Sequence, residues 1–341
     1  MLQRRFTQND VPLARALGQS TAETFVYYAP ERHPVDAEMD VSLDLGEEGN
    51  SQCAGRMPWR RVIHRIYHAD YVVVAGWSSW ICWCALAFRG MAGRPVGLRF
   101  DTIAPAPGRW RRLSMSRSRC AMRLSTTLHP VGRAASSYAE TLSDRPQVPL
   151  PYVVDDILFS PLATKPASQV VRVLVVAKLN DRENVETVIR ALSGVPYCLL
   201  KVVGEGPNKD RLRSMADEHK VPVQFLGYVP YPNLPEYYRW ADLFVHSARS
   251  EPWGVSLQEA VWSGTPFLAS KSVGALLEFG EAPEVPMSFD PEDSRALSTL
   301  IERYADAPAR AALLAQQEAA SRHLRGPEIA RAMDSYLGER K

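Results

Sequence analysis

The chain has 341 residues, 46% apolar and 23% charged, which is the composition of a globular protein with room for two domains of about 150 residues each. Its 40 basic and 38 acidic residues leave a net charge of +2, which excludes a chain that is basic throughout, as many nucleic-acid-binding proteins are. Five cysteines without any CxxC spacing leave no zinc-finger motif and indicate reduced thiols.

The N-terminal half begins without an apolar segment, since residues 1–10 read MLQRRFTQND. We therefore expect no signal peptide and a cytoplasmic protein, peripheral at a membrane if it contacts one. Residues 51–133 contain fourteen Arg and no Lys against Asp70 and Asp101, so the local charge is 14 − 2 = +12. This segment could face phosphates, an anionic membrane or an acidic acceptor. Arginines spread over solvated helix faces are the alternative.

Residues 71–88 are uncharged, but Gly-Trp-Ser-Ser interrupts them, so we predict a strand, a turn and a helix instead of a transmembrane helix. Two further strands are predicted at 95–101 and 122–129, which makes the first half α/β as well. Residues 153–169 show no periodicity and contain two prolines, which indicates a linker. We therefore expect domains at 1–157 and 170–325, a linker at 158–169, and a last helix at 326–341 that packs back on the first domain.

The second half alternates between strand and helix signals. Apolar, β-branched runs predict strands, and apolar residues spaced i, i+3, i+4 and i+7 predict helices between them. The strands are expected at 170–177, 197–203, 223–226, 242–246 and 266–270, with helices at 185–192, from about 208, at 234–240 and after 253. This order is typical of a parallel, doubly wound sheet, which binds ligands beyond the carboxyl ends of its strands.

Two glutamates eight positions apart, Glu251 and Glu259, flank the start of the helix predicted after Trp253. Glu251 precedes this helix, and Glu259 lies off its apolar stripe, so we expect Glu259 to face the ligand side without being buried. The free N–H groups of Val255 and Ser256 would bind an anion. A sugar nucleotide has the matching negative charge and hydroxyls. The alternative is that Glu251 complements the helix dipole and Glu259 is solvated.

The wider pattern resembles glycosyltransferase family 4, the retaining enzymes of the GT-B fold. The resemblance rests on GEGP (204–207), VQFLGYV (223–229) and the stretch 237–279, which contains the E-x7-E motif, and more weakly on PYVVDD (151–156). It implies an α/β protein with two Rossmann-like domains that face each other across a cleft. The first would bind the acceptor and the second the nucleotide sugar.

The resemblance also implies a role for each matching residue. Glu251 would hold the donor sugar, Glu259 would bind the nucleotide ribose, and Lys178 would bind the diphosphate. A second basic residue usually follows five positions after the first. Here that position is Glu183, and the neighbouring Arg182 is expected to replace it. The remaining donor-binding residues would be Trp253, Gly254, Val255, Ser256, Gly227, Tyr228 and Val229.

Three further positions each have a site role and an ordinary structural role as alternatives. Asp101 follows a predicted strand and would position the acceptor hydroxyl as a third catalytic residue, although a turn residue is an equal alternative. His129 is expected in a turn and Trp77 in packing, with a site role as the alternative for both. No D-x-D or His-x-His motif offers a metal site, so we expect an enzyme without metal or other cofactor. The Gly-Gly loop that many relatives carry after the first strand is missing.

The function expected is transfer of a sugar from a nucleoside-diphosphate sugar to an acceptor hydroxyl with retention of configuration. A saccharide or lipid-linked glycan is the expected acceptor, by analogy alone. Four alternatives remain open. They are a modified nucleic-acid base as the acceptor, an inactive sugar-nucleotide-binding protein, a hydrolase that uses Glu251 and Glu259 as an acid and nucleophile pair, and a sugar-nucleotide epimerase on the same fold.

Overall fold

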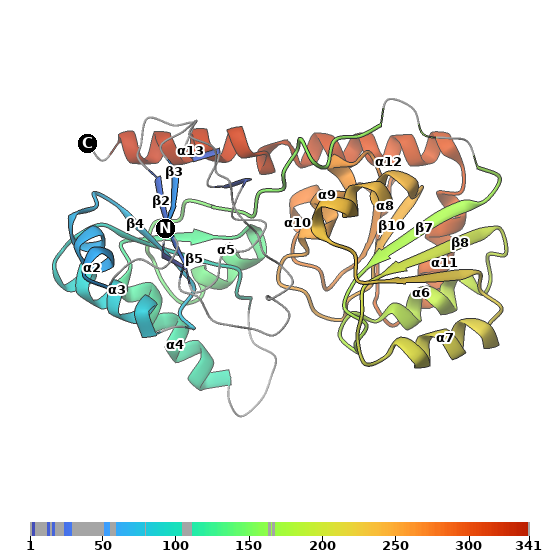
Figure 1. The fold of residues 1–341 in the computed structure, drawn as a ribbon, viewed down its shortest axis with the longest axis horizontal. Coiled ribbons are helices and arrows are strands. Elements are labelled where there is room, and N and C mark those ends of the chain that lie inside the picture. The colour runs from blue at the N-terminus through green and yellow to red at the C-terminus, as the bar shows by residue number, and fades with distance from the viewer. Residues whose placement is uncertain are drawn as a thin grey trace. The chain divides into compact units, whose positions relative to one another are not determined.

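The computed structural model describes residues 2–3, 12–13, 16–17, 24–28, 51–54, 59–78, 80–103, 111–162, 165 and 168–339. By its contacts the chain forms two compact units, Met1–Val153 with Leu324–Lys341, and Val154–His323. Each unit has a parallel sheet of its own with helices around it (Figure 1). Residues 158–169, expected as a linker, group with the second unit.

The first unit contains a parallel sheet in the order β3-β2-β1-β4-β5-β6. Its strands are β1 (Leu2–Gln3), β2 (Thr24–Tyr28), β3 (Ser51–Ala54), β4 (Val72–Ala75), β5 (Val96–Phe100) and β6 (Thr127–Pro130). Its helices are α2 (Trp59–His68), α3 (Trp80–Met91), α4 (Arg111–Leu124), α5 (Arg133–Glu140) and α13 (Gly326–Gly338). None of the first three strands was predicted from the sequence, although β2 reads TFVYY.

The uncharged stretch 71–88 forms a strand and a helix, as predicted, with β4 and α3 separated by a turn. Among the described residues, no helix has both the length and the apolarity to cross a bilayer. The strand predicted at 122–129 is shorter than expected, because the extended segment is β6 and begins only at Thr127. Met122 belongs to α4 instead, where its side chain is buried in the core.

His129 lies inside strand β6 and is fully buried, so the prediction that it sits in a turn is wrong. Its Nδ1 is 2.7 Å from the carbonyl oxygen of Val148, and its Nε2 is 2.7 Å from the hydroxyl of Tyr71. Trp77 packs partly buried against the core of this unit, as the packing interpretation expected. Both side chains therefore belong to the interior of the first unit.

The second unit repeats the strand order, with β12-β11-β10-β7-β8-β9, all parallel. Its strands are β7 (Val171–Val176), β8 (Cys198–Val203), β9 (Val223–Gly227), β10 (Leu243–His246), β11 (Phe267–Ser270) and β12 (Ser288–Phe289). Its helices are α6 (Val185–Leu192), α7 (Lys209–Glu218), η2 (Tyr231–Asn233), α8 (Leu234–Trp240), α9 (Val255–Trp262), α10 (Leu276–Phe279), α11 (Ser294–Arg303), α12 (Ala307–Ala320) and η3 (Arg322–Leu324).

Helices cover both faces of this second sheet. One layer contains α6, α7 and α11, and the other contains α8, α9, α10 and α12 (Figure 1). The strand order reverses between β7 and β10, since the chain winds outward from β7 to β9 on one side and from β10 to β12 on the other. Such a switch point, at the carboxyl ends of the strands, is where open α/β sheets bind their ligands.

The opposite, amino-terminal ends of β7 and β10 are joined by a buried ion pair. The guanidinium of Arg172 donates to Asp242 through Nε at 2.9 Å and through Nη2 at 2.8 Å, and the backbone N–H of Arg172 donates to the same carboxylate. Both residues are less than 9% exposed. A charge left alone at this place would be buried without a partner.

We therefore expect Asp242→Ala to lower the free energy of unfolding of the second unit by about 3–5 kcal/mol, because it leaves the Arg172 cation buried without its carboxylate partner. Urea unfolding followed by circular dichroism measures this loss. The exposed pair of Arg331 and Glu328 provides the control, since Glu328→Ala should cost less than about 1 kcal/mol. A similar loss in both variants would contradict the prediction.

Candidate functional site

The loops after β7 and β10 bring the predicted residues of the second unit to the switch point. Lys178, Arg182 and Glu183 follow β7, and the loop after β10 carries Glu251 toward the first turn of α9. The β7 loop lies close against the GEGP segment, since a Cβ at Gly204 would lie 1.9 Å from the carbonyl oxygen of Ala177. Gly204 also has a positive φ of 131°, so glycine is required there.

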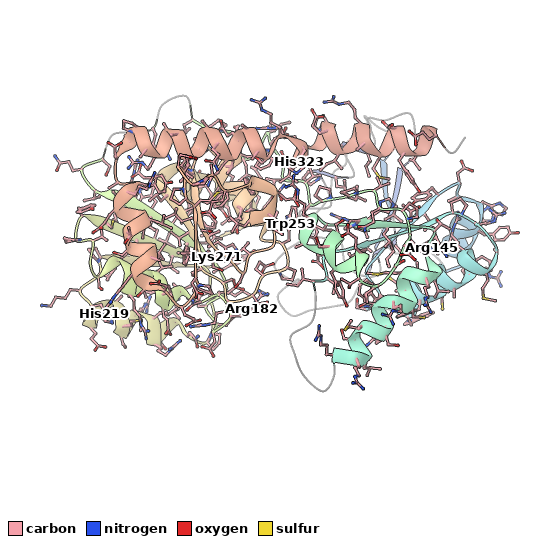
Figure 2. All side chains as sticks on the ribbon, turned by 180° about the vertical axis from the view of Figure 1, so that it is seen from behind. Arg145, Arg182, His219, Trp253, Lys271 and His323 are labelled. Atoms are coloured by element: carbon pink, nitrogen blue, oxygen red, sulfur yellow. The ribbon has the colours of Figure 1, made fainter. Side chains whose placement is uncertain are left out.

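Arg182 lies between two carboxylates at this switch point (labelled in Figure 2). Its Nη2 donates to Oε1 of Glu183 at 2.5 Å, and its Nη1 lies 3.4 Å from Oε2 of Glu251. Glu183 is buried, whereas the side chain of Arg182 is 49% exposed. The side chain of Asn180 accepts hydrogen bonds from the backbone N–H groups of Arg182 and Glu183, which fixes the loop that presents them.

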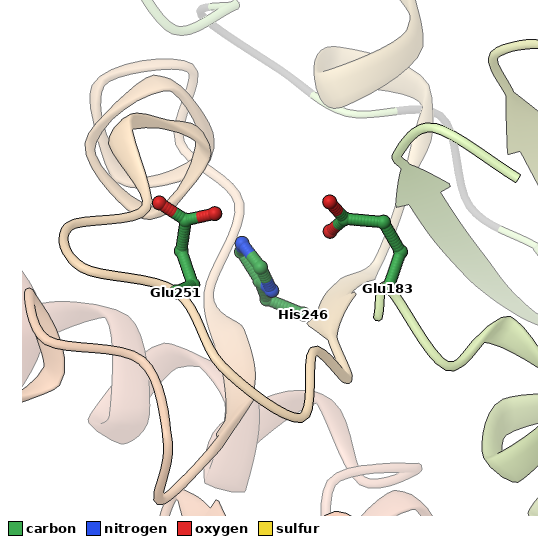
Figure 3. Close-up of side chains that lie close together, drawn as sticks. All are labelled: Glu183, His246 and Glu251. Atoms are coloured by element: carbon green, nitrogen blue, oxygen red, sulfur yellow. The ribbon is translucent and has the colours of Figure 1, made fainter. Parts of the chain in front are cut away.

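His246, the last residue of β10, joins this group and was not foreseen from the sequence. One ring nitrogen of His246 and one oxygen each of Glu183 and Glu251 lie within 4.8 Å of one another (Figure 3). Burial, followed by the nearby Arg182 cation, lowers the pKa of His246 to about 4, so its ring is neutral at pH 7. Its position at a strand end beside the switch point was the only signal in the sequence.

Carboxylates and imidazoles bind divalent cations, so these three side chains could hold one. We had expected no such group, because the sequence contains no D-x-D motif. The Arg182 guanidinium, however, contacts both carboxylates. A bound cation would have to displace it. The charges of Glu183 and Glu251 are thus already partly compensated from within the chain.

Gly254 makes the turn from the Glu251 loop into α9. Its φ is 94°, and a Cβ there would lie 2.6 Å from Cγ1 of Val273, so another residue would strain the turn. Helix α9 begins at Val255, as predicted. The indole of buried Trp253 donates to Oε1 of Gln258 at 2.9 Å, so Trp253 is fixed against the helix.

Glu259 is only 3% exposed, so the prediction that it would not be buried is wrong. Helix α9 is covered on more than its apolar stripe because α8 packs beside it, and Leu257 to Trp262 are all buried. The hydroxyl of Tyr238 on α8 donates to Oε2 of Glu259 at 2.7 Å. Burial raises the pKa of Glu259 to about 7, although the hydrogen bond from Tyr238 acts in the opposite direction.

This raised pKa predicts a loss of stability as the pH rises. The pKa of Glu259 in the folded protein, about 7, exceeds the ordinary value of 4.5. The contribution of Glu259 to the free energy of unfolding is therefore fully present below pH 4.5 and is lost as the pH rises through 7. Between about pH 5 and about pH 8, the free energy of unfolding should fall by about 2–3 kcal/mol more in the wild type than in Glu259→Gln. Urea unfolding at the two pH values measures the difference. Equal slopes in both proteins would refute it, and Glu218→Gln on exposed α7 should keep the wild-type slope.

The remaining predicted residues lie at two separate places. Lys178 is exposed at the end of β7, and no hydrogen bond or ion pair of its ammonium group is seen within the described part of the chain. Gly227 ends β9, and Tyr228 and Val229 follow it. The backbone N–H of Gly204 donates to the carbonyl of Gly227. Asp101 belongs to the first unit, after β5, where its Oδ2 accepts from the hydroxyl of Tyr152 at 3.1 Å. Residues 4–11, where relatives carry the Gly-Gly loop, lie outside the described residues.

Residues 164–321 match the model of the family described as glycosyl transferases group 1. Mannosylfructose-phosphate synthase of Agrobacterium fabrum is 41% identical over 87 residues, which are 25% of this chain and 19% of that protein. Glycogen synthase of Mycobacterium tuberculosis is 29% identical over 155 residues, or 44% and 37% of the two chains. Alpha-monoglucosyldiacylglycerol synthase of Streptococcus pneumoniae is 28% identical over 102 residues, or 28% and 23%. The chain thus spans about a fifth to two fifths of these relatives' lengths.

Among solved structures, HepE of Anabaena in complex with UDP has a TM-score of 0.76 at 16% identity, over 99% of this chain and 98% of that one. Sucrose-phosphate synthase of Thermosynechococcus elongatus has a TM-score of 0.74 at 18% identity, again over 99% and 98%. At such identities the likeness concerns the fold. It confirms the predicted α/β class with two Rossmann-like domains.

Proposed function

We propose that this chain, which matches the family model of glycosyl transferases group 1 over residues 164–321, moves a sugar from a nucleoside-diphosphate sugar to an acceptor hydroxyl, with retention and without a metal. The observation that supports this best is the arrangement at the switch point of the second sheet. There Glu251, Lys178 and the N-terminus of α9 follow neighbouring strand ends. A carboxylate suits sugar hydroxyls, and a cation and helix amides suit a diphosphate.

Glu251 is the residue proposed to hold the donor sugar. Its backbone is fixed, because its N–H donates to the carbonyl of Ser272 and its carbonyl accepts from Gly274. Its Oε1 accepts from the N–H of Trp253 at 3.3 Å, and Arg182 lies beside Oε2. A carboxylate held in this way can accept hydrogen bonds from sugar hydroxyls near the reacting carbon. We assign it binding and orientation, not nucleophilic attack.

Lys178 and the first amides of α9 are proposed to stabilise the leaving group. When the glycosyl bond breaks, negative charge grows on the departing nucleoside diphosphate, and preorganised donors lower the energy of that state. The N–H groups of Val255 and Ser256 belong to the first turn of α9, where amides have no acceptor within the helix. Arg182 would serve as the second cation while it also holds Glu251. The leaving phosphate would accept the proton of the acceptor hydroxyl on the same face of the sugar, which gives retention.

Glu259 is proposed to bind the ribose, with Gly227, Tyr228 and Val229 near the base. Tyr238 holds Oε2 of Glu259, and Oε1 makes no hydrogen bond to any residue that the structure describes. Oε1 is therefore the oxygen assigned to a ribose hydroxyl. Exposure of Tyr228 at 53% agrees with a residue that meets a ligand.

The acceptor is assigned to the first unit, with Asp101 as the residue that positions its hydroxyl. A saccharide or lipid-linked glycan is the acceptor we favour, in keeping with relatives whose names refer to mannosylfructose-phosphate, glycogen and a glucosyldiacylglycerol. Those relatives match this chain over 87, 155 and 102 residues, and the choice of acceptor follows from analogy with them.

A donor screen tests the proposed function. Purified protein is incubated with a panel of nucleoside-diphosphate sugars, without acceptor and with saccharide, lipid-linked or glucosylatable DNA acceptors, and the products are identified by mass spectrometry. We expect release of nucleoside diphosphate from one donor, and a product with the same anomeric configuration as that donor. EDTA should not change the rate of turnover. Binding without turnover would favour an inactive sugar-nucleotide-binding protein. Loss of turnover in EDTA with rescue by Mg²⁺ would refute metal independence.

A further inference from the structure

Helix α3 has apolar side chains on two opposite faces. One face is buried in the core of the first unit through Cys82, Ala85 and Leu86. The other carries Trp80, Cys84, Phe88 and Met91, spaced i, i+4, i+8 and i+11, which places them along one side of the helix. Trp80 is 66% exposed, Phe88 46% and Met91 86%. A helix that is apolar on both faces is normally covered on both.

Helix α2 extends this apolar side. Ile63 is 57% and Tyr67 40% exposed, one turn apart on α2. The rings of Tyr67 and Phe88 lie 5.7 Å apart, which joins the two helices at the surface. Beneath them, buried Arg89 of α3 donates to the carbonyl oxygens of Ile66 and Ala69 and so fixes α3 against the end of α2. We call the apolar patch the surface of Ile63, Tyr67, Trp80, Cys84, Phe88 and Met91.

Positive charge surrounds the apolar patch. Helices α2, α3 and α4 contain arginines but no Asp, Glu or Lys. Helix α4 packs beside α3, and its five arginines, Arg111, Arg112, Arg117, Arg119 and Arg123, are all exposed. The guanidinium of Arg94 lies 4.2 Å from the centre of the Tyr67 ring, at the edge of the patch. The surface therefore combines exposed aromatic and aliphatic groups with an excess of positive charge, against which Asp70, just after α2, is the acidic residue.

We propose that the α2–α4 face of the first unit binds an anionic lipid bilayer, with the apolar patch in the headgroup region and the arginines on lipid phosphates. Trp, Phe and Met on one side with Arg beside them are the composition of an interfacial surface. Nucleic acid would suit the arginines but would not cover Met91 and Ile63. Helix α3, with 12 residues, is too short to span a bilayer, so it lies in the plane of the membrane. The proposal does not depend on the reaction proposed above.

Sedimentation with vesicles tests this surface. We expect the protein to bind vesicles of phosphatidylcholine with phosphatidylglycerol, to bind pure phosphatidylcholine much less, and to dissociate with rising salt. The double variant Trp80→Ser/Phe88→Ser should weaken binding at least about tenfold by loss of apolar burial. Arg112→Glu/Arg117→Glu should weaken it by a similar factor and flatten the salt dependence.

Matched controls lie in the second unit. Tyr197 is 40% exposed and Arg295 is also exposed, so Tyr197→Ser/Arg295→Glu changes the same residue types away from the patch and should bind vesicles like the wild type. All variants should keep the wild-type thermal unfolding and the wild-type rate of donor hydrolysis. Equal binding of wild-type and patch variants would overturn the proposal. So would self-association that the patch variants abolish without any vesicle binding, or salt-sensitive binding to DNA alone.

Discussion

Glu251→Ala is expected to lower the rate of sugar transfer about tenfold or more. Hydrogen bonds to a charged group contribute about 1.5–3 kcal/mol, and each 1.4 kcal/mol corresponds to a factor of ten in rate. The loss should appear in kcat, because the carboxylate holds the sugar where the bond breaks. Steady-state release of nucleoside diphosphate, measured at several donor concentrations, separates kcat from KM.

The fold should survive the loss of Glu251, because its carboxylate is 21% exposed and the loop is held by backbone hydrogen bonds to Ser272 and Gly274. Circular dichroism and thermal unfolding check this. Glu218→Gln on α7 removes an exposed carboxylate elsewhere and should leave the rate unchanged. An unchanged rate in Glu251→Ala would remove Glu251 from the site. A loss in Glu251→Ala with recovery in Glu251→Gln would show that the hydrogen bonds matter more than the charge.

Lys178→Ala is the second variant with a large expected effect, again about tenfold or more in transfer. An exposed ammonium group costs little to remove from the fold, so its loss should affect the ligand alone. If Lys178 stabilises charge that develops on the leaving diphosphate, kcat should fall more than the affinity for free nucleoside diphosphate. Transfer kinetics combined with calorimetric titration of the nucleoside diphosphate measure both quantities.

Arg182→Ala is the comparison that shows which of the two cations, Lys178 or Arg182, binds the diphosphate. Removal of Arg182 leaves Glu183 and Glu251 facing each other without the guanidinium between them, so it changes the geometry of both carboxylates. If Lys178→Ala retained full activity while Arg182→Ala lost it, the cation of the site would be Arg182 and the assignment of Lys178 would fail. Lys209→Ala on α7, which pairs with Glu205 at the surface, is the neutral control.

The sequence by itself determined the class of fold, and it supplied the residues that we propose for the donor site. Apolar runs such as 170–177 and the periodic helix at 185–192 were strong enough to define the second sheet, because buried parallel strands require continuous β-branched residues. The start of α9 was also predicted, because a glycine between a predicted strand and a predicted helix indicates the turn at which the helix begins. In the first unit, β1 has only two residues and β3 reads SQCA, so neither gave such a signal, whereas the apolar run TFVYY of β2 was overlooked.

Tertiary structure alone decided which side chains meet. Glu259 was expected on an open face, but α8 covers it and supplies Tyr238, and no periodicity within α9 could reveal a neighbour from another helix. His246 and Glu183, 63 residues apart, come together because β7 and β10 are adjacent at the point where the strand order reverses. Arg182 stands between Glu183 and Glu251 for the same reason. Local sequence patterns predict individual helices and strands. Which charged side chains meet at a switch point depends on which strands pair, and this is decided by the whole fold.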